Sequence, residues 1–267
     1  MKAILPIRIL IIFLILLAIS AIFAWSGLDG IAWLKHIRNF AAIFLSGSIL
    51  SLILAKSVHT DPARTEHRVI TSLILFLLFD PIFPWWAFLA LGASTEALQR
   101  LIRTRSGPMF NPAALTAFVF GIAGFHPAWW GVDFPPSIPL LSGNVSIALL
   151  LTAPFAGYVA YRYRKLPIVV TTIVVFITAY LVIFGAAPTA FLMEGAFVFF
   201  LLVMAIEPKT SPVIVRDQCI YGAIIGLGIP LGMYLGATDA LLMSLLVANL
   251  YTVCFTRWRK KWSVMGG

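Results

Sequence analysis

Long apolar runs recur along this chain from one end to the other, and short clusters of Lys and Arg separate them. A run of about 20 apolar residues forms a helix that can cross the hydrocarbon core of a bilayer. Hydrophobic residues make up 61% of the sequence and charged residues 11%, whereas roughly a quarter of an ordinary soluble domain is charged. We therefore expect an all-α, polytopic integral membrane protein, a single membrane domain over residues 1–267, with the lipid bilayer as its main partner.

The net charge of +9 comes from basic clusters that lie between the apolar runs. Clusters in such positions are typical of cytoplasmic loops that face anionic lipid. Nucleic acid is therefore not an expected partner. The first run, residues 4–24, is longer than the apolar core of a signal peptide, and we interpret it as the first membrane helix.

The stretch 69–105 decides the topology. A single helix through it would contain Asp80, Pro81 and Pro84, and proline interrupts a helix because it lacks the N–H. If the chain instead turns at residues 80–84, the basic clusters fall on one side of the membrane, as the positive-inside rule requires. The exception is the predicted loop that holds Lys35 and Arg38. The clusters are Lys56/Arg64/Arg68, Arg100/Arg103/Arg105, Arg162/Arg164/Lys165, Lys209/Arg216 and Arg257/Arg259/Lys260/Lys261.

With this turn the chain has about ten membrane segments, and both termini lie on the cytoplasmic side of the inner membrane. Five segments in each half make the halves antiparallel, which is the inverted-repeat arrangement. We expect the first repeat over residues 1–125 and the second over residues 144–256. The predicted segments are 4–24, 40–55, 69–79, 85–103, 110–125, 144–159, 167–184, 190–206, 219–235 and 240–255.

Three polar features interrupt the apolar segments. Asn111 precedes Pro112 and is either a helix N-cap or part of a ligand site at a broken helix end. The segment from Glu207 to Thr210 follows another apolar run, and is either a solvated loop or a site for a polar ligand. Glu96 lies inside an apolar segment, and we expect it to pair with Arg100 or Arg103 or to belong to a functional site.

The sequence predicts no metal centre. Two cysteines cannot complete a zinc or iron–sulfur site within one chain. All four histidines, which are His36, His59, His67 and His126, are predicted in or beside loops, and this disfavours haem ligation.

Four strings of the sequence together resemble the RnfD/NqrB family, the membrane flavin subunits of ferredoxin:NAD and sodium-pumping NADH:quinone oxidoreductases. The strings run in order through most of the chain. They are TEHRVITSLILFLLFDPIFPWW at 65–86, FNPA at 110–113, IEPKTSP at 206–212 with IYGAIIG at 220–226, and LVANL at 246–250. The resemblance implies a ten-helix inverted repeat and makes Asn111, Glu207 and Thr210 candidates for holding a flavin.

One departure from the family concerns the flavin attachment. Family members usually carry a D-x-x-S/T-G-A-T type sequence in an outer loop, where FMN is esterified to a threonine. The corresponding loop here, residues 126–143, has no threonine, and Glu207 replaces an Asp of the family. We therefore expect a flavin, riboflavin or FMN, to be bound without a covalent bond.

The expected function is a membrane electron-transport subunit that works beside other membrane subunits of a redox complex. The flavin would supply the redox chemistry, and the protein would position the flavin and set the dielectric constant around it. Two alternatives stay open. One is a transporter or channel for a small solute on the same inverted-repeat fold. The other is a purely structural subunit.

Overall fold

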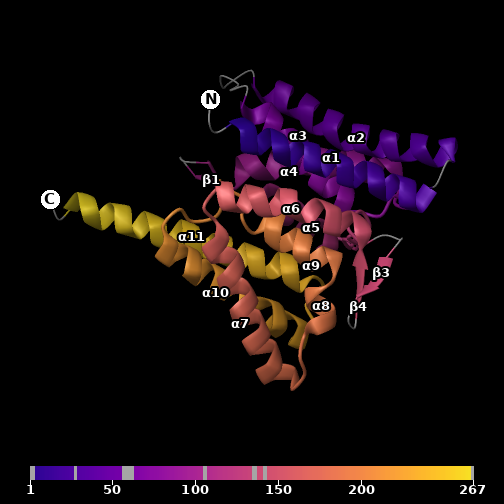
Figure 1. Ribbon diagram of the computed structural model, residues 1–267. Coiled ribbons are helices and arrows are strands. Elements are labelled where there is room, and N and C mark those ends of the chain that lie inside the picture. The colour runs from indigo at the N-terminus through magenta and orange to yellow at the C-terminus, as the bar shows by residue number, and fades with distance from the viewer. Residues whose placement is uncertain are drawn as a thin grey trace.

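The computed structural model describes residues 4–26, 29–55, 63–104, 107–133, 137–140 and 143–265. The described chain is built mainly of helices, with two short antiparallel strand pairs. In Figure 1 the first four helices form an upper group, α7, α10 and α11 form a lower group, and α5, α6 and α9 lie between them. The helices are α1 Ile4–Ser26, α2 Gly30–Ala55, α3 Ala63–Leu78, α4 Trp85–Leu101, α5 Pro112–Ile122, α6 Ile147–Arg162, α7 Leu166–Phe184, α8 Thr189–Leu192, α9 Gly195–Phe199, the π-helix η1 Phe200–Met204, α10 Val215–Tyr234 and α11 Ala240–Met265.

The strands are confined to two connections. Strand β1 (Arg103–Thr104) pairs with β2 (Gly107–Pro108) between α4 and α5. Strand β3 (Ser137–Leu140) pairs with β4 (Gly143–Ser146), so the helix predicted from residue 144 begins three residues later.

Within the described residues, three helices are long and apolar enough to cross a membrane: Ile7–Ser26, Gly30–Leu54 and Leu166–Phe184. No more than a third of each apolar window is buried inside the molecule. Exposed Ile, Leu and Val side chains on helices of this composition fit contact with lipid, because water would not solvate such a surface.

The turn predicted at residues 80–84 is present between α3 and α4. The Asp80 carboxylate accepts a hydrogen bond from the Ile82 N–H at 2.8 Å, and Pro84 precedes the first residue of α4. Arg68 near the start of α3 lies 4.0 Å from Glu96 near the end of α4, so the two helices run in opposite directions. The prediction of two short helices in place of one interrupted span is confirmed.

Helix α2 is longer than the predicted segment 40–55 and begins at Gly30. Lys35 and Arg38 therefore lie in a helix, and the prediction that they occupy a loop is wrong. The Asp29 carboxylate accepts the Ile31 N–H at 2.9 Å and so supports this earlier start. The added turns bury His36 and Asn39 and leave Lys35 and Arg38 exposed.

The predicted segment 190–206 is not one helix, and this prediction is also wrong. The chain breaks at Met193 and Glu194, between α8 and α9. The Asp133 carboxylate accepts the Gly195 N–H at 2.9 Å, at the first residue of α9. Gly195 also packs on the backbone of Val132 so closely that a Cβ would lie 2.2 Å from the Val132 oxygen.

Two helix pairs make the most extensive contacts, α2 with α4 and α7 with α10. Each pair is brought together by a glycine. A Cβ added at Gly92 of α4 would lie 2.0 Å from the Ile43 oxygen of α2. A Cβ added at Gly222 of α10 would lie 2.7 Å from the Ile168 oxygen of α7. Only glycine allows backbones to approach so closely.

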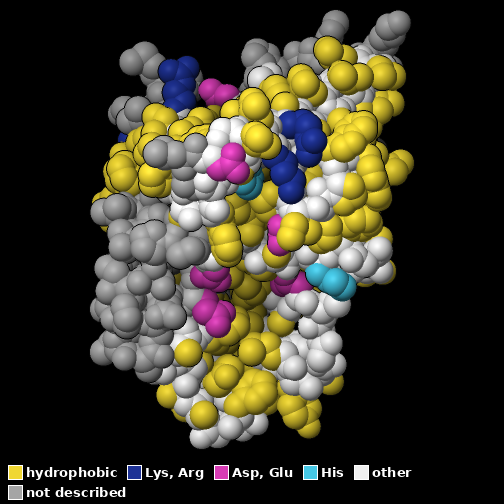
Figure 2. Space-filling view, turned by 90° about the vertical axis from the view of Figure 1, so that its right-hand side faces the viewer, with side chains coloured by type: hydrophobic (Ala, Val, Ile, Leu, Met, Phe, Trp, Pro, Cys, Tyr) yellow, Lys and Arg dark blue, Asp and Glu magenta, His cyan; other side chains and the backbone are white. Residues whose placement is uncertain are grey.

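Connections far apart in sequence meet at each end of the molecule. At one end the Trp129 indole N–H donates to Asp239 at 3.1 Å, which joins the connection before α6 to that between α10 and α11. Figure 2, which views the right-hand side of Figure 1, shows Asp and Glu side chains gathered near the middle of that face. At the other end the connection between α6 and α7 meets the one after η1, through Lys165.

Among the predicted cytoplasmic basic residues, Lys56 and Arg105 lie outside the described residues.

Candidate functional site

Two adjoining cavities lie beside the connection that follows η1. We call the first the basic cavity, of about 270 Å³, because Arg68, Arg100, Arg103 and Lys209 line it. We call the second the apolar cavity, of about 210 Å³, which lies between residues of α1, α3, α5, α6 and η1. Four residues line both cavities: His67, Thr71, Glu207 and Lys209.

Asn111 lines the apolar cavity and is 2% exposed. Its side-chain oxygen accepts the Ala114 N–H at 3.0 Å, so it is the N-cap of α5. Its amide also donates to the Met204 carbonyl at 3.3 Å, at the end of η1. Both groups of the amide are therefore engaged within the protein, and Asn111 ties the first turn of α5 to the end of η1.

The Met204 carbonyl has no α-helical donor, because residue 208, four positions further on, is a proline without an N–H. The Ala205 N–H bonds to the Phe200 carbonyl, five residues back, in place of the α-helical partner. The chain then leaves the helix, and the Glu207 N–H approaches the Met204 oxygen only at 3.4 Å. The Asn111 amide supplies a second hydrogen bond to this carbonyl.

Glu207 stands between the two cavities and lines both. The Thr210 hydroxyl donates to its carboxylate at 3.0 Å. Burial raises the pKa of Glu207 from 4.5 to about 7, and the Thr210 hydrogen bond and the Lys209 charge oppose this shift. The Glu207 carboxyl can therefore take up or release a proton near neutral pH.

Thr210 is buried behind Glu207 and is not among the lining residues of either cavity. Of the three predicted site residues, the structure thus brings Asn111 and Glu207 to one cavity. Thr210 reaches that cavity only through the carboxylate it holds.

Lys165, which sequence reasoning placed among solvated loop cations, is 3% exposed. Its ammonium donates to the Pro212 carbonyl at 2.6 Å and to the Ser211 carbonyl at 3.3 Å. Burial lowers the pKa of Lys165 from 10.5 to about 8. The Gln218 amide also donates to the Pro212 carbonyl, at 3.2 Å. These contacts fix the end of the segment that begins at Glu207.

The far wall of the basic cavity carries an ion-pair network. Arg100 donates through Nε to Glu96 at 2.7 Å, so the predicted pairing of Glu96 with Arg100 is confirmed, and Arg103 is not its partner. Arg68 lies 4.0 Å from the same carboxylate, a contact not expected from the sequence. Both arginines also bond to Ser51 of α2. One carboxylate therefore serves two guanidinium groups.

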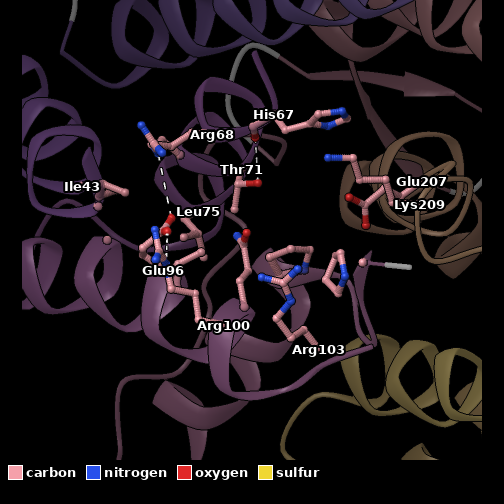
Figure 3. A pocket seen from close by; sticks show the side chains of 18 residues that line it. Ile43, His67, Arg68, Thr71, Leu75, Glu96, Arg100, Arg103, Glu207 and Lys209 are labelled. Atoms are coloured by element: carbon pink, nitrogen blue, oxygen red, sulfur yellow. Dashed lines mark hydrogen bonds and ion pairs between the residues drawn. The ribbon is translucent and has the colours of Figure 1, made fainter. Parts of the chain in front are cut away.

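Arg103 and Lys209 lie on other sides of the basic cavity. Figure 3 shows Lys209 extending toward the cavity from the connection after η1, and Arg103 approaching from the strand after α4. Within the described part of the chain, the Arg103 guanidinium has no hydrogen-bond or ion-pair partner. Four basic residues line this cavity against two acidic ones, Glu96 and Glu207.

The histidines do not all lie in or beside loops, contrary to the sequence prediction. His36 is buried in α2, where its Nε2 lies 3.1 Å from the Ser26 hydroxyl and its ring stacks on Trp130. His67 is in α3 and lines both cavities. His59 lies outside the described residues.

A scan against protein-family models finds none that matches the chain, and a search of curated proteins finds no match either. The resemblance to the RnfD/NqrB family therefore rests on the four sequence strings alone.

Proposed function

We propose that the chain is a ten-span membrane subunit of the RnfD/NqrB type, built as a five-plus-five inverted repeat over residues 1–125 and 144–256. In this arrangement the second and fourth helices of the halves are α2 and α4, and α7 and α10. These two pairs make the most extensive helix–helix contacts in the described chain, and each has a glycine of its fourth helix against a backbone oxygen of its second, at Gly92 and Gly222. Their equivalence supports the proposal.

A second equivalence concerns the connections after the third and eighth segments. The Asn39 amide of α2 donates to the Pro81 carbonyl at 3.4 Å, and Lys165 just before α7 donates to the Pro212 carbonyl. In each half a polar side chain that lies in the second helix or directly precedes it thus bonds to the proline-containing connection. The two connections lie at opposite ends of the molecule in the proposed topology, as an inverted repeat requires.

We propose that the two adjoining cavities hold a flavin without a covalent bond. The observation that carries this proposal is that Asn111 and Glu207, one from each half, line a single cavity. Each cavity is smaller than the roughly 300–1,000 Å³ of a usual ligand site, and together they reach that range. An isoalloxazine ring, with an apolar benzenoid end and a polar pyrimidine end, suits an apolar cavity that opens toward polar groups.

The residues present would hold and orient the flavin, which supplies the electron-transfer chemistry when bound. The Glu207 carboxyl, with its pKa near 7, would hold a proton at the edge of the ring or release it. Thr210 fixes the direction of that carboxyl through its hydroxyl. Asn111 keeps η1 and α5 together and so sets the width of the cavity. Electrons would pass to and from other membrane subunits of a complex.

The visible spectrum of the purified protein tests this function. We expect flavin absorbance that dithionite bleaches, and complete release of the flavin on denaturation. Asn111→Leu should lower flavin content strongly while the protein still inserts, whereas Asn111→Asp keeps the N-cap acceptor and should lower it less. A colourless protein from riboflavin-replete cells would contradict the proposal, and a fluorescent band on a denaturing gel would contradict non-covalent binding.

A second candidate is a transporter or channel for a small anion on the same fold. The excess of basic side chains in the basic cavity favours it, because such a lining raises the local concentration of anions. Uptake of an anion into proteoliposomes by colourless protein would favour this function over electron transport.

A further inference from the structure

We propose that the basic cavity is a binding site for a phosphate group. The inference deepens the proposed function, because a flavin in the apolar cavity would place its phosphate here, but the site can also be tested without flavin. Three ligands carry a phosphate group that this cavity can bind: FMN, free inorganic phosphate and a phospholipid through its headgroup.

The charge of the lining is the first argument. The lining of the basic cavity includes four basic residues, Arg68, Arg100, Arg103 and Lys209, and two acidic ones, Glu96 and Glu207. Glu96 is engaged by two arginines at once. The carboxyl of Glu207 is close to half-protonated near pH 7, since burial raises its pKa to about 7. The lining therefore has excess positive charge, and such a lining raises the local concentration of anions.

The geometry of the donors is the second argument. The Arg68 and Arg100 side chains are each 21% exposed, and Glu96 and Ser51 hold them in place. The Nε of Arg68 is buried 4.0 Å from Glu96 and makes no hydrogen bond among the described residues. Arg103 and Lys209 reach the same cavity from β1 and from the connection after η1 (Figure 3). Guanidinium groups match phosphate oxygens through paired hydrogen bonds, and an ammonium adds a point charge.

The position of the site relative to the apolar cavity is the third argument. His67, Thr71, Glu207 and Lys209 line both cavities, so one ligand can occupy the two. A flavin with its aromatic ring among the apolar side chains and a phosphate among the arginines would be FMN. The structure thus favours FMN over riboflavin as the flavin of the proposed site.

The experiment uses the full-length protein in nanodiscs of phosphatidylcholine, and it compares Arg103→Gln, the double variant Arg103→Gln with Lys209→Met, and the control Arg162→Gln. Arg162 is an exposed basic residue at the same end of the molecule and does not line the cavity. Inorganic phosphate binding is measured by equilibrium dialysis, FMN and riboflavin binding by fluorescence, and retention of phosphatidylglycerol by native mass spectrometry. A normal size-exclusion profile and melting temperature identify variants that are folded.

We expect wild-type protein to bind at least one phosphate ligand, with FMN bound more tightly than riboflavin. Arg103→Gln should weaken phosphate binding roughly tenfold, the double variant should weaken it further, and Arg162→Gln should leave it unchanged. Retention of phosphatidylglycerol by wild type but not by the double variant would identify a lipid headgroup as the source. Equal phosphate binding by folded wild type and double variant, or binding of none of the phosphate ligands, would overturn the inference.

The two proposals fail in different ways. If phosphate or phosphatidylglycerol binds and neither flavin does, the phosphate site holds and the flavin function fails. If FMN and riboflavin bind equally and the double variant binds both as wild type does, the flavin function holds and the phosphate site fails.

Discussion

The ammonium of Lys165 lies 2.6 Å from the carbonyl oxygen of Pro212, 47 residues further along the chain. The bond holds the start of α7 against the end of the segment that carries Glu207. A buried lysine that donates to carbonyl oxygens has its charge solvated by the backbone in place of water. The site geometry therefore depends on a residue that touches neither cavity.

Lys165→Met should remove this support without adding a charge or a large change in volume. We expect the free energy of unfolding to fall by about 1–3 kcal/mol, because the Ser211 carbonyl loses a buried hydrogen bond. The Pro212 carbonyl keeps the Gln218 amide, which limits the loss. Thermal unfolding in detergent measures the effect. Arg162→Met at an exposed position is the control, and an equal loss in both variants would contradict a specific role for Lys165.

Gly92→Ala and Gly222→Ala should both destabilise the helix pairs. The added Cβ would lie 2.0 Å from the Ile43 oxygen and 2.7 Å from the Ile168 oxygen, so each pair of helices must separate. Overpacking of this kind typically costs about 1–3 kcal/mol. Gly157→Ala in α6 is the matched control, because no atom lies within 4 Å of its added Cβ. Melting temperatures of the three variants should place Gly157→Ala at or above wild type and the other two clearly below.

Stability should depend on pH through Glu207. Since its pKa rises from 4.5 in the unfolded chain to about 7 in the folded protein, the folded state holds an extra proton between these pH values. The contribution of Glu207 to the free energy of unfolding should therefore be highest at the acid end of this window and fall as the pH rises toward 7. His67 has the opposite effect below about pH 6.5, because burial lowers its pKa from 6.5 to about 4, so the comparison with Glu207→Gln, which has no proton to lose, isolates the Glu207 contribution. Melting temperatures measured across this range check the slope, and identical slopes in the two proteins would contradict the assignment.

The inverted repeat predicts opposite sides for two exposed positions. Ile82 lies in the turn between α3 and α4, and Val213 lies in the connection between η1 and α10; they are 78% and 83% exposed. In a background with Cys219 and Cys254 replaced by Ser, Ile82→Cys should react with an impermeant maleimide only from outside the cell. Val213→Cys should react only after the cytoplasmic side is opened. Labelling of both from the same side would contradict the antiparallel halves.

Local features of the fold could be predicted from the sequence. The turn at residues 80–84 follows from two prolines and the charge distribution, and the pairing of Glu96 with Arg100 follows from their spacing on one helix face. Asn111 was recognisable as an N-cap because it precedes Pro112. Each of these depends on residues within a few positions of one another.

Features that depend on distant residues could not be predicted. The first residue of α9, Gly195, donates its N–H to Asp133, which lies 62 residues earlier in the chain. The start of α2 at Gly30 depends on the burial of His36 and Asn39 against other helices, which hydropathy alone does not show. The burial of Lys165 gave no sequence signal, because the residue stands in a basic cluster that is typical of an exposed loop.

The wide π-helical turn of η1 affects the direction in which the residues after it point. Before η1, the contact of Gly195 with Val132 positions the chain. At the end of η1 and beyond it, the hydrogen bond from Asn111 and the walls of the two cavities position the chain. Each residue of an α-helix advances the chain by about 100° around the helix axis. Rewinding Phe200–Met204 as an α-helix with the same number of residues would therefore rotate Glu207 by about that angle, away from the cavities. The wider turn thus absorbs one residue and keeps the packing surfaces on its two sides in register.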